Sequence, residues 1–357
     1  MGPLVVDPHR CVRMAGGAAL RRLGDVADNG GVGLTLEIAR TLEITDLLWQ
    51  CDDHGKPIPV LRAEAVSRLA GLGQRRAARI VERMPATGGV LDAQDVDELM
   101  LRVHCELQRL SEELQLARRI ADLLAPLVSR IRETGGGAAV RVVDVGCGIG
   151  YVVRWLAATS ALGAGIELVG VDMNATLVGA ATRLADRESL DCRFVRGDAF
   201  DPGVAVEDGP RTVVISSGLM HHVPAAELAG FFGAQAALDV AAFAHWDIVP
   251  CAWSTLGAWV FHQARMREPV SRHDGVMSAR RAHPAEVLLA AARASAPAYA
   301  ARVLEGGRWH PRAIDVLRPV VGVSAALRID NPARRSASMT AKSRPASGLP
   351  GSAGVLG

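Results

Sequence analysis

The stretch Val142-Val-Asp-Val-Gly-Cys-Gly-Ile-Gly150 decides the fold, because it joins a run of β-branched apolar residues to a helical pattern that begins near Tyr151. Glycines at alternate positions let the backbone turn sharply and approach a ligand without interference from a Cβ atom. The pattern is GxGxG preceded by Asp144, which differs from the GxGxxG of dinucleotide-binding loops. The sequence contains no GxxxxGK(S/T) phosphate loop. We expect a strand, a ligand-binding turn and a helix in succession.

Outward from this loop, strand-like and helix-like segments alternate to about residue 260. The alternation predicts an α/β fold with a doubly wound parallel sheet and helices on both faces. The second strand, Ile166–Val171, ends at Asp172, which places a carboxylate beside the glycine loop, where it can accept both hydroxyls of a ribose. A plain strand-end cap is the alternative role for Asp172.

These segments resemble the class I S-adenosylmethionine-dependent methyltransferases over about residues 139 to 250. The resemblance implies a Rossmann-like core in which Asp172 binds the ribose and Asp198 meets the adenine amino group. A fourth segment, Val213-Val-Ile-Ser-Ser-Gly-Leu-Met-His-His-Val-Pro224, is similar to the family's fourth-strand motif. The cofactor-binding residues that the resemblance implies are Asp144, Gly146, Cys147, Gly148, Gly150, Asp172, Met173, Asp198 and Ala199.

The chemistry of the loop agrees with this cofactor. A ligand with a ribose, an adenine and a positively charged sulfonium suits a loop with carboxylates and no lysine or arginine, whereas dinucleotide binding is the disfavoured alternative. Purely structural roles remain open for two acids: Asp144 as a brace for the glycine turn, and Asp198 as an ordinary turn former. Cys147 contributes its backbone, because no nearby base is available to activate its thiol.

The methyl acceptor is expected beyond the carboxyl ends of the fourth and fifth strands, where open α/β sheets bind ligands. His221 and His222 follow the fourth strand, and His245 and Asp247 lie in the fifth. A histidine can serve as a base near neutral pH, but aligning the two reactants also suffices for methyl transfer. The catalytic residues are therefore open, with His222 and Asp247 as candidates and pocket-wall or helix-cap roles as alternatives.

The segment from Arg265 to His283 is dense in arginine and histidine around an expected turn at Asp274-Gly275. It is similar to a segment that borders the acceptor pocket in a bacterial subset of these enzymes. In that interpretation its basic side chains anchor an acidic acceptor. The alternative is a solvated basic loop before a helix at Pro284. The candidate anchors are Arg272, His273, Arg280 and Arg281.

Three regions are predicted along the chain. Residues 1–134 read as helices, a glycine run at 135–137 marks a boundary, residues 139–325 form the methyltransferase domain, and the Ala, Ser, Gly, Pro and Arg composition of residues 331–357 predicts a disordered tail. The N-terminal domain is interpreted as a cap over the acceptor site, with a homodimer surface as the alternative.

A nucleic-acid substrate is the main alternative to a small molecule. Residues 69–80 resemble a helix-hairpin-helix element, and six arginines against two glutamates lie between Leu61 and Arg83. Over residues 1–138, however, 18 basic residues face 19 acidic ones, so the region is not broadly basic as phosphate binding prefers. We favour a small-molecule acceptor; RNA methylation, protein methylation or cofactor binding without turnover are the alternatives.

Composition sets the remaining expectations. With 49% hydrophobic and 22% charged residues and a net charge of +2, a chain disordered throughout is excluded. Six scattered cysteines without ligand spacing predict reduced thiols and no metal site, and the N-terminus lacks an export signal, so a cytoplasmic location is expected. The apolar window Ala241–Phe261 contains His245, Asp247 and Pro250, which favours a buried strand followed by a helix over a membrane span.

Overall fold

The computed structural model describes residues 13–14, 41–52, 56–206, 209–251, 253–304 and 317–327. The predicted disordered tail at residues 331–357 lies outside them, as does most of the chain before Thr41.

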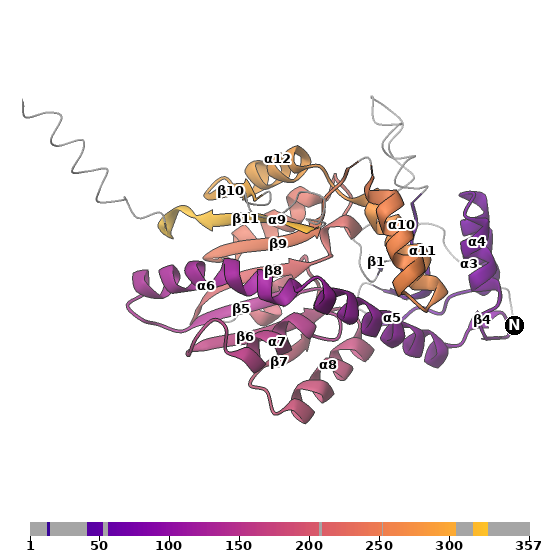
Figure 1. The fold of residues 1–357 in the computed structure, drawn as a ribbon, viewed down its shortest axis with the longest axis horizontal. Helices are drawn as coiled ribbons and strands as arrows, with labels where there is room; N and C mark the ends of the chain where they lie inside the picture. Colours follow the sequence, from indigo (N-terminus) through magenta and orange to yellow (C-terminus); the bar gives the residue numbers. More distant parts are fainter. Residues whose placement is uncertain are drawn as a thin grey trace, which may run out of the picture.

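A seven-stranded sheet with the order β10-β11-β9-β8-β5-β6-β7 forms the centre of the molecule (Figure 1). β5 pairs in parallel with β6 and β8, β6 with β7 and β8 with β9, whereas β11 is antiparallel to β9 and β10. The order reverses at β5, so the crevice between the ends of β5 and β8 is where such sheets bind ligands. The strands are β5 Val140–Val145, β6 Ile166–Asp172, β7 Arg193–Arg196, β8 Arg211–Ser217, β9 Ala242–Ile248, β10 Tyr299–Val303 and β11 Leu317–Ser324.

Helices cover both faces of the sheet, because alternate residues of its apolar strands point to opposite sides. Val142 packs with α6 and α7 on one face, and Val143 packs with α9 and α12 on the other. The prediction of a doubly wound α/β sheet is confirmed. The helices are α6 Leu116–Thr134, α7 Tyr151–Thr159, α8 Ala175–Glu188, α9 Leu228–Ala237, α10 Ser254–Arg265, α11 Pro269–Arg281 and α12 Ala285–Ser295.

The described residues before α6 (13–14, 41–52 and 56–115) are mainly helical and pack against one end of the sheet (Figure 1). Their core continues into the domain that follows, where Ile149, Leu177 and Val270 join the same apolar cluster. Helix α6 packs on the sheet although it precedes the predicted domain boundary at residue 134. That boundary therefore stays a prediction. The elements of this region are β1 Arg13–Met14, α2 Ile44–Leu48, β2 Gln50–Cys51, α3 Arg62–Gly71, α4 Arg75–Glu82, β3 Ala86–Thr87, β4 Val90–Leu91 and α5 Ala93–Glu113.

The turn expected at Asp274-Gly275 is wrong, because α11 runs through both residues. The buried Asp274 carboxylate accepts hydrogen bonds from the backbone N–H groups of Ile44 (2.8 Å) and Thr45 (3.0 Å), at the start of α2. Gly275 lies where the ring of His262 packs, and a Cβ atom would collide with that ring. Asp274 and Gly275 are residue types that usually mark a turn. Here they pack α11 against α2 and α10.

The apolar window Ala241–Phe261 forms strand β9 and most of helix α10, as its polar residues predict. In the parts of the chain that the structure describes, none of the helices has the length and hydropathy needed to cross a membrane.

Candidate functional site

The glycine loop follows β5 at the centre of the sheet. Gly146, Gly148 and Gly150 have φ values of 71°, 56° and 73°, in the left-handed region that other residues avoid. The backbone N–H of Gly146 donates to the carbonyl oxygen of Val171 (2.8 Å), which ties the loop to β6. A Cβ atom on Gly148 would lie 2.6 Å from Cδ2 of His104, so the loop needs glycine for space as well as for conformation.

Asp172 braces this loop from the end of β6. Its Oδ2 accepts from the N–H of Gly148 (2.9 Å) and its Oδ1 from the N–H of Asn174 (2.9 Å). The bracing role that the sequence offered for Asp144 is thus performed by Asp172. Each carboxylate oxygen can accept a second bond, so the same side chain can also bind ligand hydroxyls.

Asp144 is buried beside the loop, with 2% of its surface exposed, and its Oδ1 has no hydrogen-bond partner. Burial and the nearby charge of Asp172 raise the pKa of Asp144 to about 8. A buried carboxyl with an unused oxygen is costly unless a partner satisfies it. The carboxyl groups beside the glycine loop therefore fit a cationic ligand such as a sulfonium cofactor.

Two further segments from the cofactor prediction lie at the same sheet edge. β6 and β7 pair Asp172 with Arg196, and the N–H of Gly197 donates to the carbonyl oxygen of Asp172 (3.0 Å), which places Met173 close to Asp198 and Ala199. Asp198 Oδ1 accepts from the N–H of Phe200 (2.9 Å), as a turn-forming aspartate does.

Cys147 contributes its backbone to the loop, and its thiol is unsuited to nucleophilic attack. Burial and the charges of Asp172 and Asp144 hold the pKa of the thiol well above its usual value.

The fourth-strand motif places two histidines next to the glycine loop. They belong to the short 3-10 turn η2, Met220–His222, and a Cβ atom on Gly146 would lie 2.9 Å from Cδ1 of the preceding Leu219. Asp247 Oδ2 accepts from the backbone N–H of His221 (2.7 Å), and its Oδ1 pairs with His221 Nδ1 (2.8 Å). The two candidates named from the sequence, His222 and Asp247, are therefore not paired with each other: Asp247 binds His221.

The ionised state of Asp247 is well supported by its contacts. Burial alone would raise the pKa of this carboxyl, but the charge and hydrogen bonds of His221 and the N–H of Ile248 hold it below its usual range. In the neutral tautomer of His221 that donates its Nδ1 hydrogen to an ionised Asp247, Nε2 is the acceptor atom of the ring.

His245 belongs to the core and not to the site. Both of its ring nitrogens are engaged, Nδ1 with Ser216 Oγ (2.9 Å) and Nε2 with Gln235 Oε1 (3.0 Å), and burial lowers its pKa to about 3. A neutral, fully bonded imidazole at this position stabilises the packing of β8, β9 and α9.

Two acids that sequence reasoning missed, Glu43 and Asp46, come from the start of α2. Asp46 Oδ2 pairs with Arg281 Nη1 (2.5 Å), and Glu43 Oε1 accepts from Ser278 Oγ (2.8 Å). Arg281 Nη2 also contacts His222 Nδ1 (2.7 Å). No pattern in the short stretch around α2 distinguishes these acids from surface residues, because Ser278 and Arg281, the partners that bind them here, lie 235 residues away in sequence.

Glu43 has an unusual protonation equilibrium. Burial raises its pKa to about 7, against the opposing effect of the nearby Arg281. Its Oε1 lies 3.9 Å from Nε2 of His221, and its Oε2 lies 3.8 Å from Nε2 of His222. The carboxyl can therefore exchange a proton with its surroundings near neutral pH.

Glu43, His221 and His222 place one ligand atom each within 4.8 Å of one another, a spacing that a metal ion can use. Arg281 lies on the same group of side chains, 3.7 Å from Glu43 Oε1. The guanidinium brings positive charge to the position that a cation would need, which disfavours metal binding. The absence of a metal site stays a prediction.

His104, on α5, connects the loop to this cluster. Its Nδ1 donates to the carbonyl oxygen of Met100 (2.8 Å), and its ring packs on Gly148. Burial lowers the pKa of His104, while the charge of Asp172 raises it and that of His222 lowers it, so both side chains are near. The helical region before α6 thus supplies one wall of the site, and the helical pattern of α5 alone did not single out this residue.

Three of the four candidate anchors for an acidic acceptor make contacts within the protein. Arg281 pairs with Asp46, Arg272 Nε donates to the carbonyl oxygen of Met266 (2.7 Å), and His273 Nδ1 contacts Asp274 Oδ1 (2.7 Å). The fourth, Arg280, is exposed at the surface.

The strand order, with one antiparallel strand beside six strands of common direction, and the glycine loop at its reversal point define a class I methyltransferase fold. Residues 142–238 match the model of a protein family described as "Methyltransferase domain". The chain therefore carries a class I S-adenosylmethionine-dependent methyltransferase domain, and S-adenosylmethionine is its cofactor.

One curated relative is the ribosomal RNA small subunit methyltransferase C of Alcanivorax borkumensis, 38% identical over 66 residues. The match covers 18% of this chain and 19% of the relative, so the chain aligns with about a fifth of that protein.

Similar solved structures include the plantazolicin methyltransferase BamL, with a TM-score of 0.45 and 11% identity over 62% of this chain and 90% of that one. Another is the magnesium protoporphyrin IX methyltransferase of Synechocystis, with a TM-score of 0.36 and 16% identity over 74% of this chain and 99% of that one. The identification of the domain rests on the family match and the strand order.

Proposed function

We propose that the protein transfers a methyl group from S-adenosylmethionine to an oxygen, nitrogen or carbon nucleophile of a small-molecule acceptor. The observation that carries this proposal is the His221–Asp247 pair at the carboxyl ends of β8 and β9, in the same parallel sheet in which β5, the neighbour of β8, carries the glycine loop. A base and a cofactor loop at one sheet edge are the two parts that such a transfer needs.

For the cofactor, the proposal assigns Asp172 to the ribose hydroxyls, Asp198 to the adenine, and the unpartnered carboxyl of Asp144 to the positively charged end. Gly146, Gly148 and Gly150 present their backbone, as do Cys147, Met173 and Ala199. The bound cofactor supplies a methyl group on a positively charged sulfur. The ring of His104 packs against the glycine loop at Gly148.

For the acceptor, His221 is the proposed base in place of His222. Its Nδ1–H donates to Asp247, which orients the ring and leaves Nε2 to take the proton that the acceptor loses. The electron pair of the broken acceptor–hydrogen bond would form the new bond to the methyl carbon, while the electron pair of the broken carbon–sulfur bond would stay on the sulfur, which loses its positive charge. Glu43, 3.9 Å from Nε2 and with a pKa of about 7, is placed to pass that proton on.

A small acceptor is favoured because the reactive side chains are enclosed. Glu43, Asp46, His221 and Asp247 are all buried, and Arg281 of α11 contacts both Asp46 and the carbonyl oxygen of His221. A duplex or a folded RNA would have to reach a buried base, whereas a small molecule needs only a pocket. We also propose that the region before α6 acts as a cap rather than as a dimer surface, and that the protein is cytoplasmic.

RNA methylation is the second candidate. α3 and α4 form a helix pair joined through Gly73, which has a φ of 77°, as the helix-hairpin-helix resemblance predicts. The 66-residue similarity to a ribosomal RNA methyltransferase favours the same candidate.

Two experiments test the proposal. Calorimetric titration should show binding of S-adenosylmethionine and of its demethylated product; no binding at about 1 mM ligand, a very weak affinity, contradicts the core assignment. The purified protein is then incubated with cell extract and methyl-labelled cofactor, and the products are separated by size before and after nuclease and protease treatment. Label in the small-molecule fraction supports the proposal, nuclease-sensitive macromolecular label supports RNA, and no transferred label supports a cofactor-binding module without turnover.

A further inference from the structure

Helices α3 and α4 are joined by a tight turn. The N–H of Gln74, the residue before α4, donates to the carbonyl oxygen of Leu69 in α3 (2.9 Å), and Gly73 between them has a φ of 77°. Such a left-handed glycine with this hydrogen bond is a common way for a helix to end, and here the chain enters the next helix directly. α3 and α4 therefore form a helix-turn-helix pair.

A β-hairpin follows this pair and is tied to the start of α3. β3 and β4 are joined by Gly88 and Gly89, whose φ values of 60° and 83° suit a two-residue hairpin turn. The N–H of Leu91 donates to the carbonyl oxygen of Val60 (2.9 Å), and the N–H of Arg62 donates to that of Gly89 (2.9 Å). A Cβ atom on either glycine would meet no atom of the described residues within 4 Å. The hairpin thus forms an open wing after the second helix.

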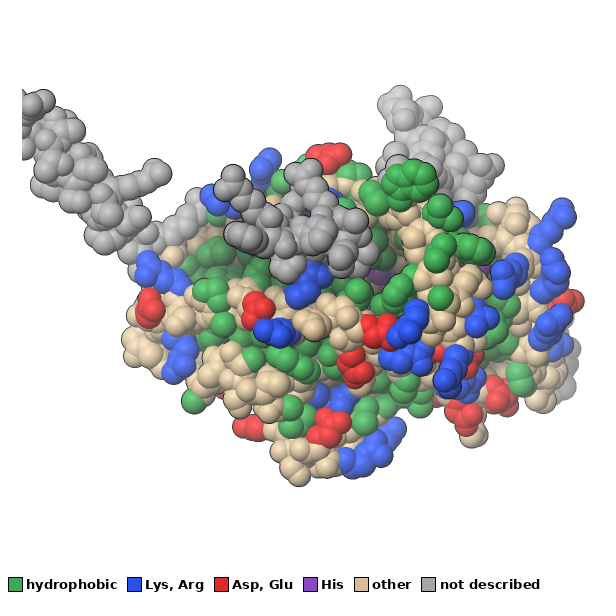
Figure 2. Space-filling view, viewed as in Figure 1, with side chains coloured by type: hydrophobic (Ala, Val, Ile, Leu, Met, Phe, Trp, Pro, Cys, Tyr) green, Lys and Arg blue, Asp and Glu red, His purple; other side chains and the backbone are tan. Residues whose placement is uncertain are grey.

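The exposed side of α4 is strongly basic. The buried residues of this helix are small or aliphatic, whereas its exposed positions are charged. Among the described residues, none of the exposed arginines has a carboxylate within ion-pair distance. Basic side chains gather over α3 and α4 at the right of the space-filling view (Figure 2). The exposed charged residues of α4 and its C-cap are Arg75, Arg76, Arg79, Glu82 and Arg83.

Two of these arginines lie at the end of the helix that disfavours them. Arg75 and Arg76 begin α4, and its first turn contains no acid. The unpaired N–H groups at the start of a helix carry positive charge, so they repel cations and attract anions. A negatively charged partner would relieve this repulsion. The charge pattern of α4 therefore favours the binding of an anion over the stability of the free helix.

The length of the basic face suits the major groove of duplex DNA. From Arg75 to Arg83 the chain advances by roughly 12 Å at about 1.5 Å per residue. The major groove of B-form DNA is about 12 Å wide and admits one helix between two rows of phosphates, and helix-turn-helix proteins place their second helix there. The major groove of duplex RNA is too deep and narrow for side chains to read. An exposed basic helix therefore fits DNA better than RNA.

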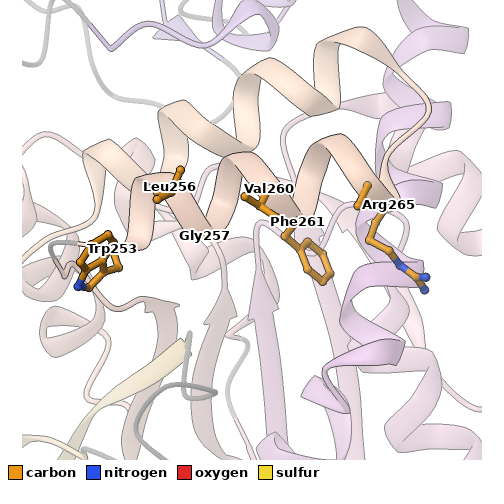
Figure 3. A pocket seen from close by; sticks show the side chains of 7 residues that line it. Trp253, Leu256, Gly257, Val260, Phe261 and Arg265 are labelled. Atoms are coloured by element: carbon orange, nitrogen blue, oxygen red, sulfur yellow. The ribbon is translucent and has the colours of Figure 1, made fainter.

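The position of α4 leaves this face accessible in the described part of the molecule. α3 and α4 lie at one end, beyond α10 and α11 (Figure 1). The exposed face of α10 is different in kind, because apolar side chains such as Trp253 and Leu256 line it (Figure 3). Its one charged lining residue, Arg265, pairs with Glu113. Phosphate binding is therefore assigned to α4 and not to α10.

From these observations we propose that α4 and the β3–β4 hairpin bind duplex DNA, with α4 in the major groove and the hairpin against the adjacent backbone. This inference goes beyond the proposed function. None of the residues assigned to the cofactor or to the acceptor lies on α4 or on the hairpin, and binding needs no methyl transfer. The DNA is a binding partner, and the methyl acceptor stays a small molecule.

Two double variants with the same change of charge test the inference. Arg75→Gln with Arg79→Gln removes two arginines from the exposed face of α4, and Arg183→Gln with Arg187→Gln removes two from the exposed face of α8. In each pair the second Nε donates to the carbonyl oxygen of the first residue, at 3.4 Å in α4 and 3.3 Å in α8. The probe is a fluorescein-labelled DNA duplex of mixed sequence, about 25 base pairs long, and fluorescence anisotropy measures its binding to the full chain as salt is raised.

The wild type should bind the duplex, with an affinity that falls as salt rises. The α4 double variant should weaken binding by about tenfold or more at about 50 mM salt, and lower the slope of log affinity against log salt by about 2, because two phosphate contacts are lost. The α8 double variant should stay within about twofold of the wild type. Glu82→Gln removes the acid from the basic face and should strengthen binding by about twofold, a gain that unfolding cannot produce.

The inference is overturned by equal affinities and salt slopes in the two double variants, or by a wild type that does not bind DNA at about 50 mM salt. Tighter binding of an RNA duplex of the same sequence overturns it in favour of RNA. Tighter binding of polyglutamate overturns it in favour of an acidic protein partner.

Discussion

The two halves of the candidate site are built in different ways. The cofactor half consists of the glycine loop and the acids at the ends of neighbouring strands, and its groups lie within residues 144–199. The acceptor half joins α2, η2, β9 and α11, with contacts such as Asp46 to Arg281 that span 235 residues. The first half depends on backbone conformation in one region of sequence, whereas the second depends on how distant helices pack.

The halves also differ in their charge balance. Asp144 has an oxygen without a partner and a pKa raised to about 8, so the cofactor half is left to receive a cation. In the acceptor half, Arg281 already pairs with Asp46 and lies near Glu43. The cofactor half therefore contains a buried carboxyl oxygen without a protein partner, whereas the charges of the acceptor half are paired within the protein.

The largest expected effect is on catalysis by the acceptor half. His221→Asn should lower the rate of methyl transfer by about a thousandfold, the contribution of a well-placed base, and leave the affinity for S-adenosylmethionine unchanged. His222→Asn, the neighbouring change, should lower the rate far less. Single-turnover transfer of labelled methyl measures both; a greater loss in His222→Asn would return the catalytic role to that residue.

The next effect is on stability. Arg281→Met leaves the buried Asp46 and Glu43 without their cation and should lower the free energy of unfolding by about 3 kcal/mol. Arg280→Met, at the exposed neighbouring position, is the control. Urea unfolding measures the change, and adding Asp46→Asn to Arg281→Met should restore most of the loss. An unchanged Arg281→Met would show that the ion pair does not hold α2 in place.

A smaller effect is expected for the cofactor half. Asp172→Ala removes the acceptor for two backbone N–H groups and for the ribose, and should weaken S-adenosylmethionine binding by about a hundredfold. Asp186→Ala, an exposed change on α8, should have no effect. Calorimetric titration compares the two, and equal affinities would contradict the cofactor site.

The smallest expected effect is the change in S-adenosylmethionine affinity with pH that comes from Asp144. Its pKa of about 8 leaves the carboxyl neutral in the free protein below that pH, and a cationic ligand favours the ionised form. Affinity for S-adenosylmethionine should therefore rise with pH, by up to about tenfold per unit, and level off above about pH 8. Calorimetry across this range compares the wild type with Asp144→Asn, which removes the titrating carboxyl. The same change of affinity with pH in both proteins contradicts the assignment.

Much of the cofactor half could be predicted, because its signals are local. Alternate glycines require a sharp turn, and Asp172 closes the neighbouring strand. The sequence assigns Asp144 to the cofactor, with bracing of the glycine turn as the alternative; the structure gives that brace to Asp172 and leaves Oδ1 of Asp144 without a partner. The different roles of the Asp144 and Asp172 carboxyls depend on which backbone N–H groups face each of them. The order of residues alone does not specify those contacts.

Local sequence patterns specify the alternation of strands and helices, the glycine loop and the region in which an acceptor base would lie. Tertiary packing pairs Asp247 with His221 rather than His222, brings Glu43 and His104 to the site, and keeps Asp274-Gly275 within a helix. The physical reason is range: strand periodicity and positive φ are properties of a few neighbouring residues, whereas side-chain pairing follows from the packing of helices that are far apart along the chain.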